Sequence, residues 1–334
     1  MIAIVGSGSW GTALAIHLAR GGTAVRLCAR TAQTAEAITA RRHNPWYLTD
    51  LEIPRGVEAT ADPTVALAGA ELVIVAVPSE FFDATLARLT PSVGTVIVSA
   101  TKGFDPVRHL RMSELVRERF PASPTAVLSG PTFAREVALA RPTAAVIAAG
   151  DDALATDLQE RLRSRELRLY TNRDVVGVEA GGALKNVIAV ATGISDGLGL
   201  GENARAALVT RGLAEMTRLA VALGGEPSTL AGLAGLGDLV LTATGTLSRN
   251  RALGMALGRG DSPARAAAST RMVAEGVPTV RSALALAAAH RVSMPIGEEV
   301  AAVLFDRKAP VEALLTLLGR TATREDLTTG GRRA

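Results

Sequence analysis

The sequence begins Met1-Ile-Ala-Ile-Val-Gly6-Ser-Gly8-Ser-Trp-Gly11, an apolar run followed at once by three glycines spaced Gly-x-Gly-x-x-Gly. A helical apolar period then continues to Arg20, so the stretch predicts a strand, a glycine turn and a helix. Gly6 permits the tight turn, Gly8 lets the pyrophosphate of a dinucleotide approach the backbone, and Gly11 lets helix and strand pack closely. The stretch therefore indicates a dinucleotide site at a helix N-terminus. The alternative is a glycine-rich loop without a ligand.

A second apolar strand is expected at residues 24–28, and the residue that follows it decides which dinucleotide fits. An acidic side chain at this place would hold the ribose 2′-hydroxyl of NAD, but the sequence has Arg30. A cation there accommodates the 2′-phosphate of NADP. We expect NADPH to bind at least as well as NADH; the alternative is that Arg30 points into solvent.

Apolar strands alternate with amphipathic helices through the first half, which is typical of a parallel sheet covered by helices on both faces. After residue 174 the apolar period is helical throughout, and Asn203 is expected to cap a long helix. The predicted fold class is α/β, with an N-terminal Rossmann-type parallel-sheet domain at residues 1–174 and an all-helical C-terminal domain at residues 175–334. The expected strands are residues 2–5, 24–28, 72–77, 95–99, 126–129, 144–147 and 167–170.

Composition argues against several classes of protein. With 334 residues and 48% hydrophobic content, the chain is long enough for about two domains. No apolar run is expected to reach the roughly 20 residues that cross a bilayer, and no signal peptide is expected. A net charge of +4 with 3% aromatic residues favours no nucleic-acid partner. The single cysteine, Cys28, fits a reducing cytoplasm, and no metal site is predicted.

Lysine is rare in this chain, because only Lys102, Lys185 and Lys308 occur among 36 lysine and arginine residues. A buried lysine can give up its proton, whereas arginine cannot, so a lysine in an apolar setting is a catalytic candidate. Lys185 lies in such a setting, beside the pair Gly181-Gly182, which lets backbone or ligand come close. Lys102 follows a predicted strand at the edge of the sheet where ligands bind. The alternative for each is a snorkelling surface lysine.

Three polar groups complete the predicted site. Asp238 is a carboxylate among apolar neighbours, so it needs a cation, and Lys185 is the candidate partner. The tripeptide Ser248-Arg249-Asn250 precedes an apolar helix, where its hydroxyl, guanidinium and amide would hold a phosphate. The turn Gly130-Pro-Thr-Phe-Ala134 opens a short helix and offers the Thr132 hydroxyl to a ligand. The alternatives are that the aspartate, serine and threonine are ordinary helix caps.

Together these motifs resemble bacterial NAD(P)-dependent glycerol-3-phosphate dehydrogenase, over nearly the whole chain and in the family's order. The resemblance implies a Rossmann domain followed by an all-helical domain. It also implies reversible hydride transfer between NAD(P)H and dihydroxyacetone phosphate, which gives sn-glycerol 3-phosphate for glycerophospholipid synthesis. The motifs that carry it are Gly6-Ser-Gly-Ser-Trp-Gly-Thr-Ala-Leu-Ala15, Thr101-Lys-Gly103, Gly130-Pro-Thr-Phe-Ala134, Ala183-Leu-Lys-Asn186, Thr210-Arg-Gly-Leu-Ala-Glu-Met216, Gly235-Leu-Gly-Asp238, Ser248-Arg-Asn250 and Glu275-Gly-Val277.

The resemblance also implies roles for individual residues, with Lys185 as the proton acceptor and Lys102 and Asp238 beside it. It leaves the assembly open, with a homodimer as one candidate. Beyond the glycine turn, the implied cofactor contacts are Ser9, Trp10, Arg30, Lys102, Ala134, Arg249, Val273 and Glu275. The implied contacts to the small phosphorylated substrate are Lys102, Gly130, Thr132, Lys185, Asp238, Ser248, Arg249 and Asn250.

Lys185 would donate a proton to the C2 alkoxide during reduction and remove the hydroxyl proton during oxidation. A lysine with its ordinary pKa of about 10.4 holds the proton too firmly near neutrality. Apolar walls and Lys102 would lower the pKa of Lys185 while Asp238 would raise it, and the sequence leaves the balance open. The alternatives are a dehydrogenase for a hydroxy acid, one for a sugar nucleotide, which would need a cysteine nucleophile, and a redox-sensing module without chemistry.

Overall fold

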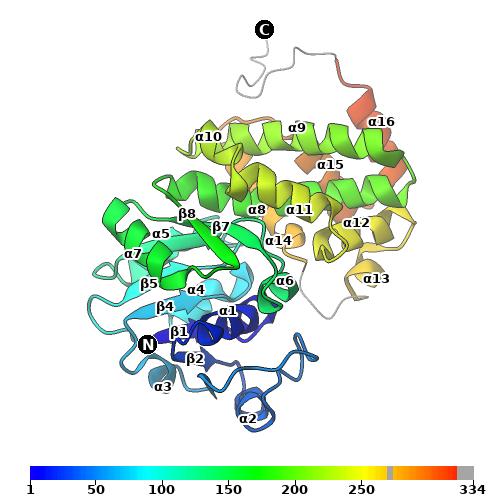
Figure 1. Ribbon diagram of the computed structural model, residues 1–334. Helices are drawn as coiled ribbons and strands as arrows, with labels where there is room; N and C mark the ends of the chain where they lie inside the picture. The colour runs from blue at the N-terminus through cyan, green and yellow to red at the C-terminus, as the bar shows by residue number, and fades with distance from the viewer. Residues whose placement is uncertain (269–273, 322–334) are drawn as a thin grey trace. The chain divides into compact units, whose positions relative to one another are not determined.

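The computed structural model describes residues 1–268 and 274–321, and its backbone contacts divide the chain into two units (Figure 1). The first unit comprises Met1–Thr101 and Met112–Val175. The second comprises Lys102–Arg111 and the chain from Val176 onward. Lys102–Arg111 was expected in the first domain but groups with the helical unit. Val273, an implied cofactor contact, and residues 322–334, which the predicted helical domain includes, lie outside the described residues.

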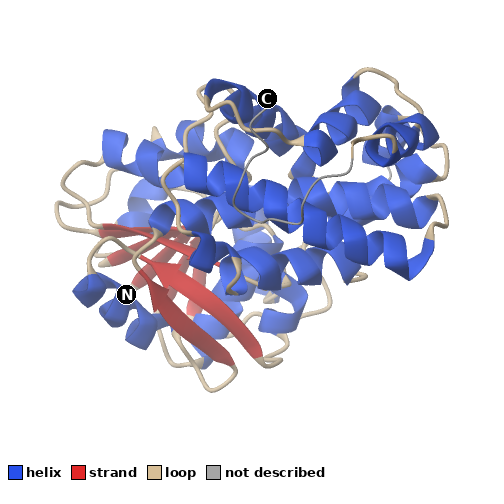
Figure 2. Ribbon diagram, turned by 90° about the horizontal axis from the view of Figure 1, so that it is seen from above, coloured by secondary structure: helices blue, strands red, loops and turns tan. Residues whose placement is uncertain are grey.

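The first unit is built on a sheet, whose strands are drawn in red in Figure 2. In the described residues it has eight strands in the order β3-β2-β1-β4-β5-β6-β7-β8. In the middle of this order Ile4 of β1 lies opposite Leu27 of β2 and Ile74 of β4, and all three are fully buried. Each such aliphatic side chain contributes about 1.5–3 kcal/mol, so the short apolar runs suffice to hold the centre of the sheet. The strands are β1 (Ile2–Val5), β2 (Val25–Cys28), β3 (Val57–Thr60), β4 (Leu72–Val75), β5 (Val96–Ser99), β6 (Thr125–Ser129), β7 (Thr143–Ala148) and β8 (Leu167–Asn172).

Helices connect the strands of the first unit and share its core, to which α1 contributes Leu14 and Ile16 and α7 contributes Leu158. This alternation confirms the predicted Rossmann-type architecture. The connecting elements are α1 (Ser9–Arg20), α2 (Ala32–Arg41), α3 (Pro63–Leu67), the 3₁₀ turn η1 (Ser79–Phe81), α4 (Phe82–Leu86), α5 (Met112–Arg119), α6 (Ala134–Ala138) and α7 (Asp152–Leu162).

The sheet departs from the prediction in two places. β7 runs antiparallel to β6, because the connection from Ser129 to Thr143 carries only the short helix α6. β3 was missed, since Val57 is its only fully buried residue and the strand lacks an apolar run. The expectation of a wholly parallel sheet is therefore corrected to a mostly parallel one.

The second unit is helical in its described residues, as predicted. Its hydrophobic core includes Leu184, Val187 and Ile188 of α8. One expectation was wrong, because Leu200 rather than Asn203 occupies the N-cap of α9. The elements are α8 (Val175–Gly197), α9 (Gly201–Ala222), α10 (Pro227–Leu230), the π-helical turn η2 (Leu233–Gly237), α11 (Asp238–Thr244), α12 (Arg249–Gly258), α13 (Pro263–Ala268), α14 (Gly276–Ala289), α15 (Pro295–Phe305) and α16 (Pro310–Leu318).

Helix α8 contradicts the expectation that no apolar segment is long enough to cross a bilayer. It has 23 residues and passes the length and hydropathy criteria for a span, as the bent pair formed by Pro227–Thr244 and Arg249–Gly258 also does. However, 89% of the apolar window of α8 is buried inside the protein. This burial is typical of the core helix of a soluble protein.

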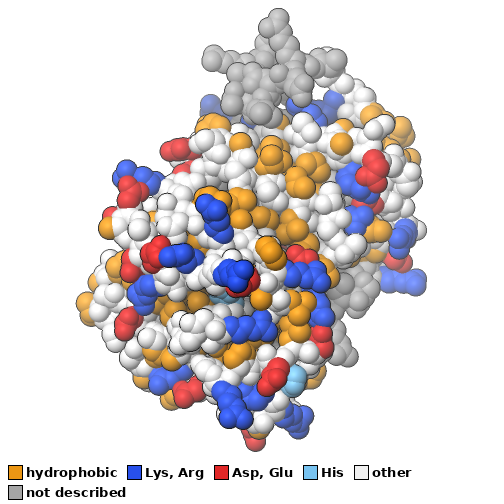
Figure 3. All heavy atoms as spheres, in the orientation of Figure 1, with side chains coloured by type: hydrophobic (Ala, Val, Ile, Leu, Met, Phe, Trp, Pro, Cys, Tyr) orange, Lys and Arg blue, Asp and Glu red, His pale blue; other side chains and the backbone are white. Residues whose placement is uncertain are grey.

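The charged side chains on the face shown in Figure 3 are mixed, with Lys and Arg interspersed among Asp and Glu. Such mixing agrees with the small net charge of +4. On this face, charges of one sign do not form the continuous field that would attract a long polyanion.

Candidate functional site

The glycine turn of the first unit has the geometry that a dinucleotide requires. Gly6 has φ +111°, and a Cβ on it would lie 2.5 Å from the Ala76 carbonyl oxygen, while a Cβ on Gly11 would lie 1.8 Å from the Gly6 oxygen. A Cβ on Gly8 would meet nothing within 4 Å, so the backbone there faces open space. α1 begins immediately afterwards at Ser9. The three glycines thus have the predicted features of a tight turn, an open approach and close packing.

Two side chains near the turn add to this picture. Among the described residues, the indole Nε1 of Trp10 is buried and has no hydrogen-bond acceptor, which leaves a donor for a ligand. Asn44, fully buried, donates from Nδ2 to the Ser7 carbonyl at 2.8 Å and to Thr12 Oγ1 at 2.9 Å. Asn44 therefore supports the glycine turn. Sequence reasoning missed this contact because Asn44 lies after the end of α2, far along the chain from the turn.

Arg30 is exposed directly after β2, where the prediction requires a cation. Arg30→Ala is expected to raise the KM for NADPH at least about tenfold and to leave the KM for NADH unchanged, since a charge-assisted bond to the 2′-phosphate contributes about 1.5–3 kcal/mol. Initial rates with each cofactor measure the effect. Arg55→Ala is the matched control, because Arg55 is another exposed arginine of this unit. A marked preference of the unaltered protein for NADH contradicts this assignment.

The second turn of the first unit that carries predicted contacts follows β6. Gly130 has φ +123°, which favours glycine, and the Thr132 hydroxyl donates to the Gly130 carbonyl at 3.1 Å. Phe133 is the N-cap of α6 and Ala134 its first residue, so the alternative that Thr132 caps the helix is wrong. The substrate and cofactor contacts of Gly130, Thr132 and Ala134 stay predictions.

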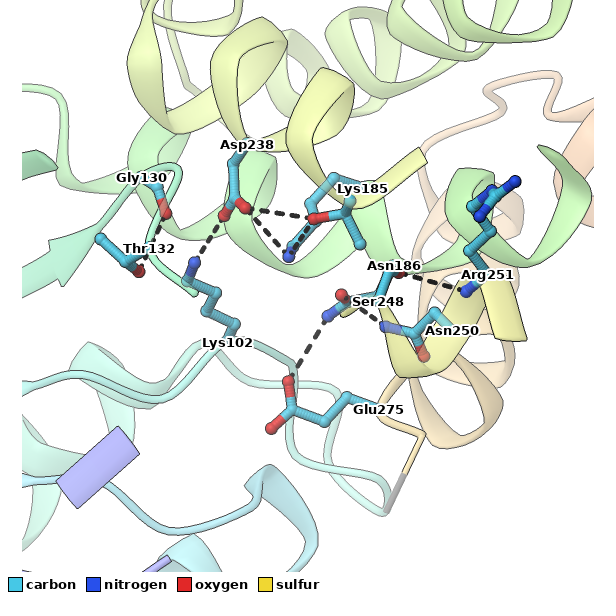
Figure 4. Close-up of polar contacts among 11 residues, drawn as sticks. Lys102, Gly130, Thr132, Lys185, Asn186, Asp238, Ser248, Asn250, Arg251 and Glu275 are labelled. Carbon is cyan, nitrogen blue, oxygen red and sulfur yellow. Dashed lines mark hydrogen bonds and ion pairs between the residues drawn. The ribbon is translucent and has the colours of Figure 1, made fainter. Parts of the chain in front are cut away.

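In the second unit, one buried carboxylate binds two lysines (Figure 4). Asp238, 1% exposed, lies 3.0 Å from Lys185 Nζ through Oδ1 and 2.6 Å from Lys102 Nζ through Oδ2. Lys185 itself is 7% exposed. The predicted Lys185–Asp238 pair is thus confirmed, and the snorkelling alternative for Lys185 is wrong. Asp238 begins α11 but Gly237 is the N-cap, so the capping alternative is wrong as well.

A threonine completes this cluster. Lys185 Nζ donates to Thr242 Oγ1 at 2.7 Å, and the Thr242 hydroxyl donates to Asp238 Oδ1 at 3.2 Å. Thr242 lies one turn after Asp238 on α11, so i,i+4 spacing from the carboxylate was the signal that could have revealed it. The hydroxyl and the carboxylate together fix the direction of the amine.

The local backbone explains how Asp238 reaches the lysine. A Cβ on Gly181 of α8 would lie 2.6 Å from the Ala234 carbonyl oxygen, so only glycine lets η2 pack this closely. η2 is a single π-helical turn, a feature that is frequent at functional sites, and α11 starts where it ends. The sequence predicted that backbone or ligand comes close to the glycine pair, and at Gly181 it is the backbone of Ala234 that does so.

The balance of charges in the cluster answers the question that the sequence left open. Burial is the main cause that lowers the pKa of Lys185, Asp238 raises it and the Lys102 charge lowers it, and together they bring the pKa from 10.5 to about 8. Burial also tends to raise the pKa of Asp238, but the two amines outweigh it and hold that pKa below its ordinary value. Lys185 is therefore poised to exchange a proton near neutral pH, as an acid–base group requires.

The tripeptide predicted to hold a phosphate is tied into the fold at two of its three residues. Ser248 caps α12 by accepting from the Arg251 N–H at 3.2 Å, which is the cap role that the sequence left as an alternative. Asn250, also buried, donates from Nδ2 to Asn186 Oδ1 at 2.8 Å and accepts from the Gly276 N–H at 2.9 Å. The amide of Asn250 thus joins α8, α12 and α14.

Glycines hold α12 against α8. A Cβ on Gly193 would lie 2.2 Å from the Arg251 carbonyl oxygen, and one on Gly254 would lie 2.2 Å from the Val190 carbonyl oxygen. The same holds one turn later, where Gly197 and Gly258 face each other's helices. The small residues let the two backbones approach closely and so fix the N-terminus of α12, where Arg249 lies.

Glu275 lies next to this network and to Arg249. Asn186 donates from Nδ2 to Glu275 Oε2 at 3.5 Å. Burial raises the pKa of Glu275 above its ordinary value, against the lowering effect of the Arg249 and Lys185 charges. Asn186 was quoted only as part of a motif, and the structure adds it to the site as the link between Glu275 and Asn250.

Comparison with protein families covers both units. Residues 1–155 match the model described as "NAD-dependent glycerol-3-phosphate dehydrogenase N-terminus", and residues 174–315 match the model for the C-terminus of the same enzyme. The chain belongs to the NAD-dependent glycerol-3-phosphate dehydrogenase family. This finding confirms the resemblance seen in the sequence motifs.

Curated relatives match this member of the glycerol-3-phosphate dehydrogenase family from end to end. The chain is 51% identical to glycerol-3-phosphate dehydrogenase [NAD(P)+] of Koribacter versatilis, with 97% of this chain and 98% of the relative covered. It is 49% identical to the enzyme of that name from Geobacter sulfurreducens, with 96% and 97% covered. A crystal structure of glycerol-3-phosphate dehydrogenase from Coxiella burnetii superposes with a TM-score of 0.91 at 41% identity, and covers 96% of this chain and 98% of its own.

Proposed function

We propose that this chain is an NAD(P)-dependent sn-glycerol-3-phosphate dehydrogenase, which transfers hydride reversibly between NAD(P)H and dihydroxyacetone phosphate and gives sn-glycerol 3-phosphate for glycerophospholipid synthesis. The observation that carries this proposal is the buried Lys185, with a pKa of about 8, between Asp238 and Thr242. Membership of the family, over both units of the chain, supports the substrate and the reaction.

The cofactor is NADPH or NADH, which when bound supplies or accepts the hydride. The residues around the glycine turn fit this group, because Gly8 faces open space and Trp10 Nε1 has no acceptor among the described residues. Gly6, Gly8, Ser9 and Gly11 would lie along the pyrophosphate, and Arg30 would lie beside the 2′-phosphate. The remaining proposed cofactor contacts are Trp10, Lys102, Ala134, Arg249, Val273 and Glu275.

Lys185 carries the proton in this proposal. Its ammonium donates a proton to the oxygen on C2 during reduction, and its neutral amine removes the hydroxyl proton from C2 during oxidation. Asp238 and Thr242 orient the amine, at 3.0 Å and 2.7 Å. Lys102 supplies a second positive charge, which stabilises the developing alkoxide and favours the neutral form of Lys185. An arginine at position 185 would lack the neutral form.

Arg249 is the proposed main ligand of the substrate phosphate, since it is the first residue of the ten-residue helix α12 and carries a guanidinium. Ser248 and Asn250 position Arg249, the first by capping α12 and the second by its buried amide contacts. Both are also proposed to contact the substrate phosphate. Gly130 and Thr132 of the first unit are proposed as further substrate contacts. The predicted phosphate pocket thus remains part of the proposal, with Asn250 acting mainly through the fold.

The pH dependence of the two directions follows from the pKa of Lys185. Reduction of dihydroxyacetone phosphate needs the ammonium, so kcat is expected to fall as pH rises through about 8. Oxidation of glycerol 3-phosphate needs the neutral amine, so its kcat is expected to rise through the same region. Rates in both directions between about pH 6 and 10 measure this. Two profiles with the same sign of slope contradict the role of Lys185.

Oxidation of NADPH and of NADH, each with dihydroxyacetone phosphate, tests the proposed reaction directly. We expect turnover with both cofactors and at least about a 100-fold lower kcat/KM with phosphate-free dihydroxyacetone, because binding energy from the remote phosphate is used at the reacting carbon. Equal turnover of the phosphate-free compound would favour a hydroxy-acid type of dehydrogenase. Tight NADPH binding without any turnover would favour a redox-sensing module.

The proposed location is the cytoplasm, where a single buried thiol such as that of Cys28 stays reduced. No membrane span is proposed, because the apolar helix α8 is buried in the helical core. We propose a homodimer as the assembly. Light scattering of the purified protein distinguishes it from a monomer.

A further inference from the structure

The segment Lys102–Arg111 belongs to the helical unit, although the chain on both sides of it belongs to the first unit. It starts just after β5 and ends where α5 begins. Its first residue is the lysine that binds Asp238 at 2.6 Å. The position of the Lys102 amine therefore depends on what holds this segment within the helical unit.

The segment closes on itself as a loop. Phe104 and Arg111 form an antiparallel bridge, and the Asp105 N–H donates to the Leu110 carbonyl at 2.8 Å. Asp105 Oδ1 accepts from the N–H groups of Val107 and Arg108, at 3.0 Å and 2.6 Å. The loop thus has a defined backbone shape, and contacts at its far end can hold its first residue in place.

An apolar anchor and a polar contact connect this loop to the helices. Phe104 is 1% exposed and lies in the same core cluster as Ala180 and Leu184 of α8. The Ser282 hydroxyl of α14 donates to the Asp105 carbonyl at 3.3 Å, and His109 Nδ1 lies 3.2 Å from the same hydroxyl. The loop is therefore held on two helices.

An ion pair holds the other end of the loop, at Arg111. Arg111 NH1 donates to Glu179 Oε2 of α8 at 3.1 Å, with the two side chains 13% and 3% exposed. Removing one partner of such a pair leaves the other charge without its counter-charge. We therefore expect the loop to move or to take up water when Glu179 is replaced. Glu179 lies on the same helix as Lys185, which makes α8 the common support of both amines.

We infer that Glu179, acting through Arg111, is a positioning residue that holds the Lys102 amine against Asp238. The inference rests on the proposed function, because it assumes that Lys102 contributes to catalysis. Glu179 binds Arg111 at one end of the loop, whereas Lys102 at the other end binds Asp238. Its effect on the reaction therefore passes through the loop and should disappear when Lys102 is absent.

A double-mutant cycle between Glu179→Gln and Lys102→Met tests this inference in the full-length protein with NADPH and dihydroxyacetone phosphate. Glu179→Gln is expected to lower kcat/KM about 10- to 100-fold, the loss that a displacement of about 1 Å causes at an active site. In the Lys102→Met background the same change is expected to cost less than about twofold. Glu179→Gln should also shift the pH midpoint of kcat upward, because the Lys102 charge no longer lowers the pKa of Lys185.

Glu215→Gln is the matched control, as Glu215 is a buried carboxylate of the same unit that accepts from the Ile296 and Gly297 N–H groups of α15. Its effect on kcat/KM should be the same with and without Lys102. Should Glu179→Gln fail to fold, Ser282→Ala removes only the hydroxyl contacts of the loop, and a smaller loss of about threefold that again depends on Lys102 is expected.

A loss from Glu179→Gln that persists in the Lys102→Met background overturns the inference, as does wild-type kcat/KM in the single variant. If the unaltered protein has no activity, both the proposed function and the inference fail. If Lys102→Met has wild-type activity, the proposed role of Lys102 fails and the inference with it, while the proposed reaction stands. These outcomes keep the two proposals separate.

Discussion

Lys185→Arg is expected to lower kcat by about 10³-fold or more, with the fold and the affinity for NADPH unchanged. Acid–base catalysis contributes about 10²- to 10⁴-fold, and an arginine cannot give up its proton in a protein. The guanidinium nitrogens would also not occupy the position of an amine that has Asp238 at 3.0 Å and Thr242 at 2.7 Å. Steady-state kinetics in both directions, together with NADPH titration, measure the effect.

Lys308→Arg is the matched control, because Lys308 is the one lysine of the sequence that does not bind Asp238. It pairs with Glu299 at 2.6 Å and is partly exposed. This variant should keep wild-type kcat within about twofold, since partly exposed ion pairs contribute little. Near-normal turnover in Lys185→Arg would remove Lys185 from the proposed mechanism.

Asp238→Asn is expected to lower the free energy of unfolding by about 3–5 kcal/mol at pH 7, because it leaves the buried Lys185 amine and the partly buried Lys102 amine without their counter-charge. Since Asp238 raises the pKa of Lys185, its removal also lowers that pKa below about 8. Lys185 then gives up its proton at a lower pH than in the unaltered protein, so the loss of stability should shrink as pH rises from that lowered pKa to about 8 and stay constant above it. Urea unfolding at pH 7 and pH 9 measures both effects.

Asp196→Asn separates stability from catalysis in this comparison. The Asp196 side chain is 4% exposed and binds two arginines, Arg205 and Arg251, each at 2.7 Å. Asp196→Asn should lower the free energy of unfolding by a similar amount. This loss should not shrink as pH rises, since arginine does not titrate there. The pH midpoint of kcat should move to lower pH in Asp238→Asn and stay constant in Asp196→Asn. An unchanged midpoint in Asp238→Asn contradicts the charge balance described for the cluster.

The parts of the site that the sequence predicted well are those encoded locally. The glycine turn could be predicted because strand, turn and helix are adjacent along the chain, although the carbonyl that excludes a side chain at Gly6 belongs to the distant Ala76. The pairing of Lys185 with Asp238 could be predicted because a carboxylate among apolar residues needs a cation and the chain has only three lysines. Both inferences rest on the chemistry of single residues.

What could not be predicted depends on tertiary contacts. The direction of β7 depends on how its connection crosses the sheet, and the cap of α9 depends on the turn before Gly201. The grouping of Lys102–Arg111 with the helices depends on Phe104 entering their core, which no periodicity in the sequence indicates. Asn250 illustrates the same limit, since its amide is typical of a phosphate ligand but is bonded to Asn186 and Gly276.

The central claim is that burial and Lys102 make Lys185 a proton donor and acceptor near neutral pH. The scarcity of lysine permits a direct measurement, because ¹³Cε-labelled lysine gives only three side-chain signals, and Lys185→Arg identifies one of them. We expect the Lys185 signal of the unaltered protein to titrate near pH 8. A midpoint near the ordinary value of 10.5 would contradict the claim.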